Sequence, residues 1–208
     1  MSTIAAFYVP VEILKAVSLF SAKQDARGPL NGVAFYKVGT VLTLTASNGH
    51  VLGIFQNMNC TNTPEDFCFL LSLDSIKALS GNAKKGTSIF LYVIKGTDGK
   101  ILIESGVTGL TVKVQEDAPL KLDSLRRVNA THKAGEGVNT VSIDGDYLVL
   151  LGKVAALFGA KYNTTHLVLG YKDSAVRASF GGLLEGWQFN GTVMPLRACT
   201  ADLYSPVF

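Results

Sequence analysis

The chain has little charge, few cysteines and no long apolar run. Charged residues make up 17% of its 208 positions, whereas hydrophobic residues make up 48%. Disorder needs the opposite balance, so we expect a sizeable buried core in one large domain or two small ones. Apolar runs such as Leu148–Leu151 are far shorter than the roughly 20 residues of a membrane-spanning helix. We therefore expect no membrane partner.

The cysteines are too few and too far apart in the sequence to suggest a disulfide framework or a metal site. Cys60, Cys68 and Cys199 form no CxxC pair, so neither a disulfide framework nor a zinc motif is indicated. Buried, inert thiols are expected. The opening residues, MSTIAAFYVPVEILK, lack the basic start and long apolar stretch of a secretory signal. We expect a mature, cytoplasmic protein.

Signatures of catalysis are also missing. Gly81–Gly86 does not supply a GxxxxGK[ST] phosphate loop, and no GxSxG, HExxH or GxGxxG occurs. His50, His132 and His166 are widely separated, which disfavours a local metal motif. We expect no cofactor, no metal and no enzymatic activity. One alternative is a hydrolase whose site is assembled from distant residues such as His50 and His166.

A unit of a strand, a short amphipathic helix and further strands occurs three times. Apolar residues at helical spacing predict the helices, and alternating polar and apolar residues predict antiparallel strands with one wet face. The expected helices are Val11–Ala22, Leu73–Leu79 and Asp146–Phe158. The expected strands are Thr3–Val9, Leu30–Tyr36, Val41–Ala46, His50–Gln56, Phe67–Leu71, Ser88–Ile94, Lys100–Ser105, Leu110–Gln115, Thr140–Ile143, His166–Tyr171, Ala175–Phe180, Trp187–Phe189 and Thr192–Pro195.

These elements predict an α+β fold with a boundary between its second and third units. The stretch Ala118–Asn139 is polar and carries lysine and arginine, as a connector does. We expect a domain of two half-units at 1–118, a connector at 119–139, and a half-size domain at 140–208 that ends in a tail. That tail, 200–208, could cover an edge strand, dock on a neighbour or occupy a pocket.

Three motifs in order carry a resemblance to a known family. Residues 28–35 read GPLNGVAF, and Leu42–Leu52 reads LTLTASNGHVL. Leu125–Val128 reads LRRV, and Val193–Arg197 reads VMPLR. These segments resemble the LNG and ATDGHRL-like hairpin, the YRRV segment and the VMPMR-type ending of the bacterial beta sliding clamp, the DNA polymerase III beta subunit family. The resemblance spans most of the chain.

The resemblance implies a DNA-clamp fold of repeated strand–helix–antiparallel-strand half-domains that form a ring by oligomerisation. Double-stranded DNA would pass through the hole without sequence specificity. DNA polymerase and other replication proteins would dock through short hydrophobic peptides. Carried over position by position, the partner-peptide pocket would use Leu30, Ser47, Gly49, His50, Leu52, Met194, Pro195, Leu196 and Arg197.

The chain departs from the family at several of these positions. Val51 stands where the family has arginine, Asn48 where it has aspartate, and Asn129–Ala130 where it usually has proline. Family rings contain twelve half-domains and this chain shows three, so a cyclic tetramer is favoured, with a trimer or dimer open. The short length suggests a phage or mobile element, and hence a host cytoplasm.

Basic residues fall on or near the expected helices, although the net charge is only +3. A ring would multiply them into a positive tunnel that holds an anionic duplex without reading its sequence. The few acidic residues on the helices, Glu12, Asp74 and Asp146, lie near N-termini, where they could serve as caps. The expected DNA-facing residues are Lys15, Lys23, Lys77, Lys84, Lys85, Lys153, Lys161, Arg126 and Arg127.

The sequence therefore predicts a polymerase processivity factor that encircles DNA. A second possibility is a clamp-fold interaction module of replication that has lost ring closure. It would bind partners through the pocket without surrounding DNA.

Overall fold

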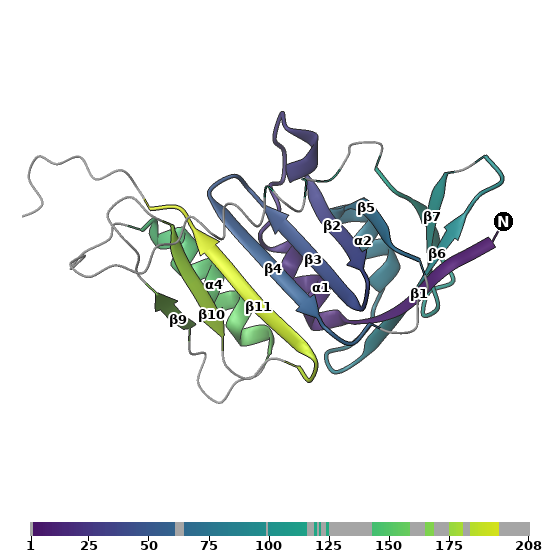
Figure 1. Ribbon diagram of the computed structural model, residues 1–208. Coiled ribbons are helices and arrows are strands. Elements are labelled where there is room, and N and C mark those ends of the chain that lie inside the picture. Colours follow the sequence, from purple (N-terminus) through teal and green to yellow (C-terminus); the bar gives the residue numbers. More distant parts are fainter. Residues whose placement is uncertain are drawn as a thin grey trace, which may run out of the picture.

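The protein has the mixed α+β architecture that the sequence predicts. A computed structural model describes residues 2–60, 65–98, 100–115, 119, 121, 124, 143–158, 165–168, 175–180 and 184–195. These residues include eleven strands and three α-helices (Figure 1). None of the helices in these ranges is long and apolar enough to cross a bilayer.

The described elements follow the order expected for units one and two and for most of unit three; of the opening strand expected for unit three, Thr140–Ile143, all but Ile143 lies outside the described residues. Unit one contains β1 (Ser2–Pro10), α1 (Val11–Ser18), a 3-10 turn η1 (Gly28–Leu30), β2 (Gly32–Val38), β3 (Val41–Ser47) and β4 (Val51–Asn57). Unit two contains β5 (Phe67–Ser72), α2 (Leu73–Ser80), β6 (Ser88–Lys95), β7 (Ile101–Ser105) and β8 (Thr111–Lys113). The described part of unit three contains α4 (Gly145–Leu157), β9 (Thr165–Val168), β10 (Val176–Phe180) and β11 (Trp187–Val193).

Units one and two exchange their first strands. β1 pairs with β6 of unit two, and β5 pairs with β2 of unit one. One sheet therefore has the order β1-β6-β7-β8. The other has the order β5-β2-β3-β4-β11-β10-β9. Because each unit contributes a strand to the sheet of the other, the two units cannot separate without breaking both sheets.

Unit three joins this pair through the edge strand of unit one. β11 runs antiparallel to β4 with a continuous register from Trp187↔Asn57 to Val193↔Val51. Gly53 and Gly191 face each other in this register, and a Cβ on Gly53 would lie 2.4 Å from the Phe20 ring. Phe20 and Phe189 contact each other there, with ring centroids 5.8 Å apart. The two glycines leave the space that these rings fill.

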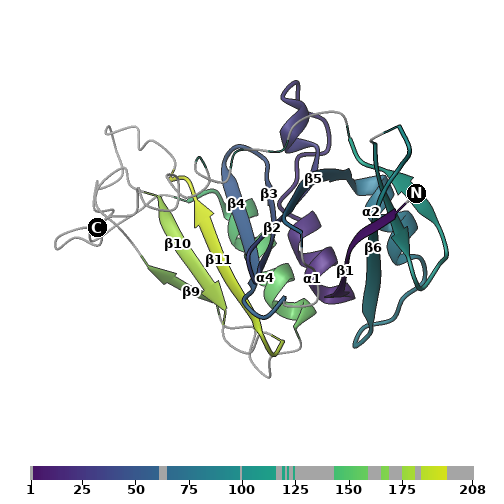
Figure 2. The same ribbon diagram turned by 45° about the vertical axis from the view of Figure 1, so that its right-hand side comes forward.

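The main hydrophobic core lies between the helices and the sheets. All three helices cover the same side of the sheets (Figures 1 and 2). α1 contacts both α2 and α4, and its side chains Val11, Ile13, Leu14 and Val17 are almost fully buried. Since α1 buries apolar residues toward both neighbouring helices and the sheet, it is the centre of the packing.

Several element boundaries differ from those that the sequence predicts. α1 ends at Ser18 rather than Ala22, because the Ala22 N–H donates to the Leu30 carbonyl 2.9 Å away instead of continuing the helix. Leu30 belongs to η1 rather than β2. β11 is one strand, although we expected two, because its pairing with β4 continues through Asn190 and Gly191.

The helix caps are also not the acidic residues we expected. Ser72 caps α2 by accepting from the Ser75 N–H, and Asp144 caps α4 by accepting from the Asp146 N–H. Asp74 and Asp146 lie in the first turns of these helices, where a carboxylate still complements the helix dipole. Glu12 is buried, and its carboxylate accepts from the Gly86 N–H. It ties the loop before β6 to α1.

Candidate functional site

The exposed lysines of the helices and the pocket residue Leu52 lie on opposite faces of the seven-stranded sheet. Val51, Phe55 and Val193 belong to the main core on the helix side. Since side chains alternate along a strand, Leu52 and its cross-strand partner Thr192 face the other way. Met194 follows Val193, the last residue of β11, and is exposed. Of the expected pocket residues, Leu52 on β4 thus lies on the face away from the helices, whereas the ring of His50 contacts Tyr147 of α4.

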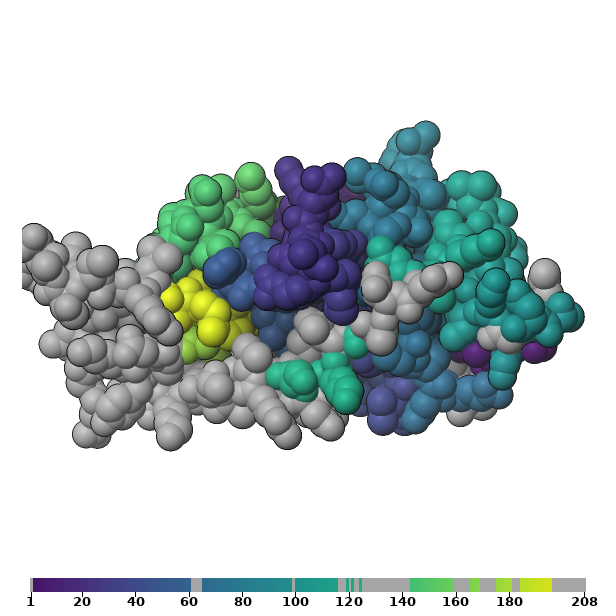
Figure 3. Space-filling view, turned by 90° about the horizontal axis from the view of Figure 1, so that it is seen from above, coloured from purple at the N-terminus to yellow at the C-terminus, as the bar shows by residue number. Residues whose placement is uncertain are grey.

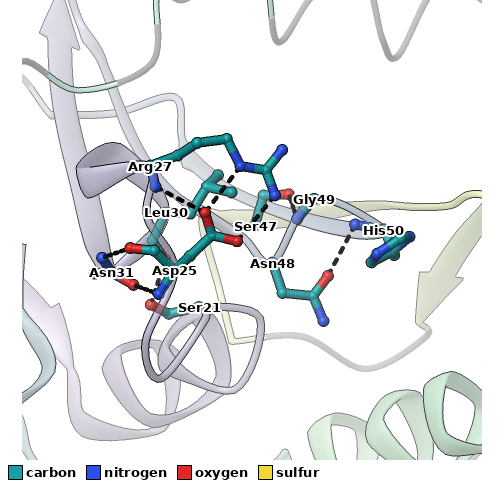
Figure 4. Close-up of polar contacts among 9 residues, drawn as sticks. All are labelled: Ser21, Asp25, Arg27, Leu30, Asn31, Ser47, Asn48, Gly49 and His50. Carbon is teal, nitrogen blue, oxygen red and sulfur yellow. Dashed lines mark hydrogen bonds and ion pairs between the residues drawn. The ribbon is translucent and has the colours of Figure 1, made fainter.

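The β3–β4 turn holds three of the expected pocket residues in a fixed geometry (Figure 4). The Asn48 side-chain oxygen accepts from the backbone N–H groups of His50 and Val51, at 3.0 and 2.9 Å. Ser47 Oγ accepts from the Gly49 N–H at 3.0 Å and donates to the Val51 carbonyl at 2.9 Å. Gly49 has a φ of 92°, a conformation that glycine adopts without strain.

The end of β11 lies beside this turn. The Met194 N–H donates to the His50 carbonyl at 2.8 Å, and the His50 ring stacks on Tyr147 of α4 with centroids 6.3 Å apart. Met194 is 46% exposed, whereas Leu30 and Leu52 are each 4% exposed. The structure thus brings the backbones of His50 and Met194 together. Among the apolar residues Leu30, Leu52 and Met194, only Met194 exposes much of its side chain to solvent. Pro195 is half-buried, and Leu196 and Arg197 lie outside the described residues.

Arg27 is a residue at this site that the sequence did not lead us to expect. Its guanidinium lies above the turn, so that a Cβ on Gly49 would be 2.8 Å from Arg27 Nη2. Arg27 Nε and Nη2 donate to the two carboxylate oxygens of Asp25, both at 2.9 Å. Asn31 braces the loop by accepting from the Asp25 N–H and donating to the Asp25 carbonyl, both at 2.7 Å. The sequence feature that could have indicated this contact is the pair Asp25 and Arg27, an acid and a base two residues apart directly before the GPLNG segment.

The paired hydrogen bonds between Arg27 and Asp25, called here the Asp25–Arg27 fork, set the charge state of the loop before η1. The side-chain hydrogen bond from Arg27 is the main cause that lowers the pKa of Asp25 to about 2, from an ordinary value of 3.8. The same bond raises the pKa of Arg27. Both groups are therefore charged at neutral pH, and the guanidinium keeps a fixed position at the edge of the turn.

The helix side carries the expected DNA-facing lysines that the structure describes. Lys15 on α1, Lys77 on α2 and Lys153 on α4 are all exposed, and these helices lie side by side (Figure 2). Lys77 makes only an exposed 3.7 Å contact with Asp74, which does little to neutralise it. Lys23 is exposed in the loop after α1. Lys161, Arg126 and Arg127 lie outside the described residues.

Lys84 and Lys85 are brought to the same side by the loop that Glu12 holds. The Val11 N–H at the start of α1 donates to the Thr87 carbonyl at 3.0 Å, and the Thr87 hydroxyl donates to the Lys84 carbonyl at 2.6 Å. Together with the Glu12–Gly86 bond, these contacts fix the loop against α1. One buried carboxylate thus positions two exposed lysines.

Groups suited to catalysis do not gather in the described parts of the chain. No group of three histidine, cysteine, aspartate or glutamate side chains there could hold a metal ion. Cys60 is buried as expected, but Cys68 is exposed, so the prediction of buried thiols is wrong for Cys68. Partial desolvation still raises the pKa of the Cys68 thiol, which disfavours the reactive thiolate. A cavity of about 520 Å³ lies at the junction of β10 and β11, lined by Phe180 and Trp187 among others. None of the expected pocket residues lines it.

Comparison with known proteins shows the fold. No protein-family model matches the chain, and no curated protein matches its sequence. Among solved structures it is similar to the DNA polymerase sliding clamp from Pseudomonas aeruginosa with ligand, with a TM-score of 0.67 at 14% identity. The match covers 95% of this chain and 67% of that one.

Two further structures give the same result. The beta subunit from DNA polymerase of Streptococcus pyogenes has a TM-score of 0.65 at 15% identity. The DNA polymerase III beta subunit from Thermotoga maritima has a TM-score of 0.62 at 16% identity. Each match covers 95% of this chain and 67% of the other. The chain has the sliding-clamp fold.

The Asp25–Arg27 fork makes a prediction about pH. Because the folded-state pKa of Asp25 is depressed, the contact is complete above its ordinary value of 3.8 and is lost as the pH falls through about 2. We expect an NMR titration of the Asp25 carboxyl carbon to give a midpoint near 2, which Arg27→Ala moves up toward 3.8. Lys100→Ala, a distant exposed change, should leave it in place. A wild-type midpoint of 3.8 would contradict this pairing.

Proposed function

We propose that the protein is a DNA polymerase processivity factor that surrounds duplex DNA and binds replication proteins on its outer face. The observation that carries the proposal is the likeness to DNA polymerase sliding clamps over 95% of the chain. The position of the lysines supports it. A sliding clamp acts as a scaffold without catalysis, and the described residues hold no evident catalytic group.

The helix side has the properties that sliding on DNA needs. Lys15, Lys77 and Lys153 stand on adjacent helices, with Lys84 and Lys85 close to α1. Exposed ammonium groups attract phosphates through long-range, salt-sensitive forces and do not read base sequence. Glu12, the one acidic residue on α1, is turned inward and hydrogen-bonded. The field that DNA meets on α1 is therefore positive.

The opposite face is suited to proteins. We propose that Met194, with Leu30, Leu52 and the Ser47–His50 turn, forms the pocket for a hydrophobic peptide, and that Pro195, Leu196 and Arg197 complete it. Methionine adapts its shape to different apolar partners. Arg27 at the edge of the turn would hydrogen-bond or charge-pair with polar groups of that peptide. Two hydrogen bonds to the Asp25 carboxylate orient the Arg27 guanidinium for this contact.

The ring requires several copies. We propose a clamp domain at 1–118 made of two half-units, a connector at 119–139 and a half-size domain at 140–208, with four chains closing the ring. A host cytoplasm and a phage origin stay predictions from the sequence.

The lysine side makes the first functional prediction. We expect the wild type to stay on a circular duplex plasmid in gel filtration and to leave it when the plasmid is linearised. The variant Lys15→Glu/Lys77→Glu/Lys153→Glu should lose at least about tenfold in retention, because each reversed charge removes a phosphate contact and its share of the salt dependence. Lys100→Glu, in the β6–β7 turn and 69% exposed, is the matched control.

Equal retention on circular and linear DNA would contradict encirclement. Peptide binding with no retention on DNA would favour the interaction module that does not close a ring.

The partner side makes the second functional prediction. We expect Met194→Asp to weaken the binding of short leucine- and phenylalanine-containing peptides by at least about tenfold, because a carboxylate in an apolar contact loses its hydration. Fluorescence polarisation with a peptide panel measures this. Met58→Asp is the control, since Met58 is 44% exposed and Met194 46%. Equal losses in both variants, or a panel without a binder, speak against the pocket.

A further inference from the structure

The outer face of the four-stranded sheet carries a group of aromatic rings. Phe7 and Val9 of β1 belong to the main core on the helix side. Since side chains alternate along a strand, Tyr8 of β1 lies on the other face, and so does its cross-strand partner Phe90 of β6. Tyr92 follows two residues further along β6, on the same face. These three residues, Tyr8, Phe90 and Tyr92, are called here the aromatic group.

The rings of the aromatic group contact one another and remain open to solvent. The Tyr8 and Phe90 centroids are 4.3 Å apart, and the Phe90 and Tyr92 centroids are 4.6 Å apart with the rings at 88°. A Cβ on Gly106 would lie 3.4 Å from Tyr92 Cε2, so the Tyr92 ring lies close to bare backbone. Tyr8 is 60% exposed, and the other two rings are half-buried. The group therefore presents ring surface to a partner.

A carboxylate adjoins the rings. Glu104 of β7 is directly opposite Tyr92, and opposite residues of an antiparallel pair have Cβ atoms about 5 Å apart. No lysine or arginine in the described parts of the chain pairs with the Glu104 carboxylate. Lys113 of β8 is opposite Leu102 rather than Glu104, and β7 separates β8 from the rings. The carboxylate is thus open to a cation from outside.

The charges of this surface select the class of partner. The faces of aromatic rings carry negative partial charge, and Glu104 adds a full negative charge beside them. Bases of a single-stranded nucleic acid can also stack on such rings, but their phosphates would meet the Glu104 carboxylate. A guanidinium suits both features, because it is planar, stacks on aromatic faces and donates in pairs to a carboxylate.

We propose that the aromatic group and Glu104 form a docking site for an arginine side chain of a protein partner. The guanidinium stacks on the rings while its N–H groups donate to the Glu104 carboxylate. Ile94 and Leu102 are opposite each other on the same face and are half-buried. They provide an apolar contact for a neighbouring residue of the partner. The partner is therefore a segment that carries an arginine beside an apolar residue.

This site does not rest on the proposed function. Its residues come from β1, β6 and β7, whereas the expected peptide pocket uses β4, the β3–β4 turn and the end of β11. In Figure 3 the teal atoms of unit two form the right-hand end of the molecule, away from α4 and β11. The site also lies on the face opposite the helices and their lysines. A partner can therefore bind here while the other two surfaces are occupied.

NMR of the full-length chain with isotope-labelled tyrosine and phenylalanine rings, recorded without DNA, tests the site. The probes are the peptide acetyl-Gly-Leu-Arg-Leu-Gly-amide and the same peptide with citrulline, an uncharged planar analogue of arginine. We expect the arginine peptide to shift the Tyr8 and Tyr92 signals and to bind at least about fivefold more tightly than the citrulline peptide. Only the guanidinium has a charge for the rings and the carboxylate to attract.

Two variants and a matched control locate the contact. Glu104→Gln and Tyr8→Leu should each weaken the arginine peptide by at least about threefold, because each removes one of the two attractions. Glu185→Gln changes the net charge by the same amount at an exposed position before β11 and should leave the affinity unchanged. Since the substituted side chains lie on the outer face, thermal melting followed by circular dichroism should show that the variants fold.

Each outcome decides the matter. Equal affinity for the two peptides, an equal loss in Glu185→Gln, or binding without a shift of the Tyr8 and Tyr92 signals overturns the site. Oligothymidylate that displaces the arginine peptide from these rings would assign the face to bases. Ring signals that move on dilution without a probe would assign it to a second copy, and either result overturns the proposal too. If the arginine preference appears but the protein does not stay on circular DNA, the site stands and the proposed function fails.

Discussion

The antiparallel pairing of β4 with β11 is the contact on which the rest of the molecule depends. It joins unit three to unit one along seven residue pairs and makes one seven-stranded sheet of strands from opposite ends of the chain. It also brings α4 against α1 and sets Met194 beside His50. Without this seam the two halves of the candidate pocket would have no fixed relation.

The register of this seam, the antiparallel pairing of β4 with β11, is specified by side-chain packing as well as by backbone hydrogen bonds. Gly53 and Gly191 oppose each other, and the rings of Phe20 and Phe189 occupy the space that side chains would otherwise take. A one-residue slip would turn every side chain of β11 to the other face. The core residues Phe189 and Val193 would then point away from the helices. Aromatic rings over glycines thus fix the register that aligns the pocket.

The same sheet keeps two kinds of surface apart. The helices and their exposed lysines lie on one side, and Leu52 and Thr192 lie on the other. The proposed function is compatible with this separation, because lysines near an apolar pocket would raise the cost of desolvation there. Glu12 fixes the loop before β6 against α1. The Asp25–Arg27 fork fixes the loop before η1, beside the β3–β4 turn.

Local patterns in the sequence were enough for most of the elements. Alternation in β6 and helical spacing in α2 depend on near neighbours, and the α+β fold is confirmed. The continuity of β11 and the pairing of β4 with β11 depend on residues more than a hundred positions apart. The end of α1 depends on the hydrogen bond from Ala22 to Leu30 beyond the helix. Periodicity reports none of these contacts. Arg27 was missed for a similar reason. Its role appears only when the turn at Gly49 comes next to it.

Hydrogen–deuterium exchange of the backbone amides of β4 and β11 tests this account most directly. If the seam is part of a single core, these amides should exchange as slowly as those that β2 and β3 share, and they should be released together with them as denaturant is added. Early exchange of β11 and of the β11-facing amides of β4, while β2 and β3 stay protected, would show that unit three is only loosely attached. The common sheet, and the pocket built across it, would then be contradicted.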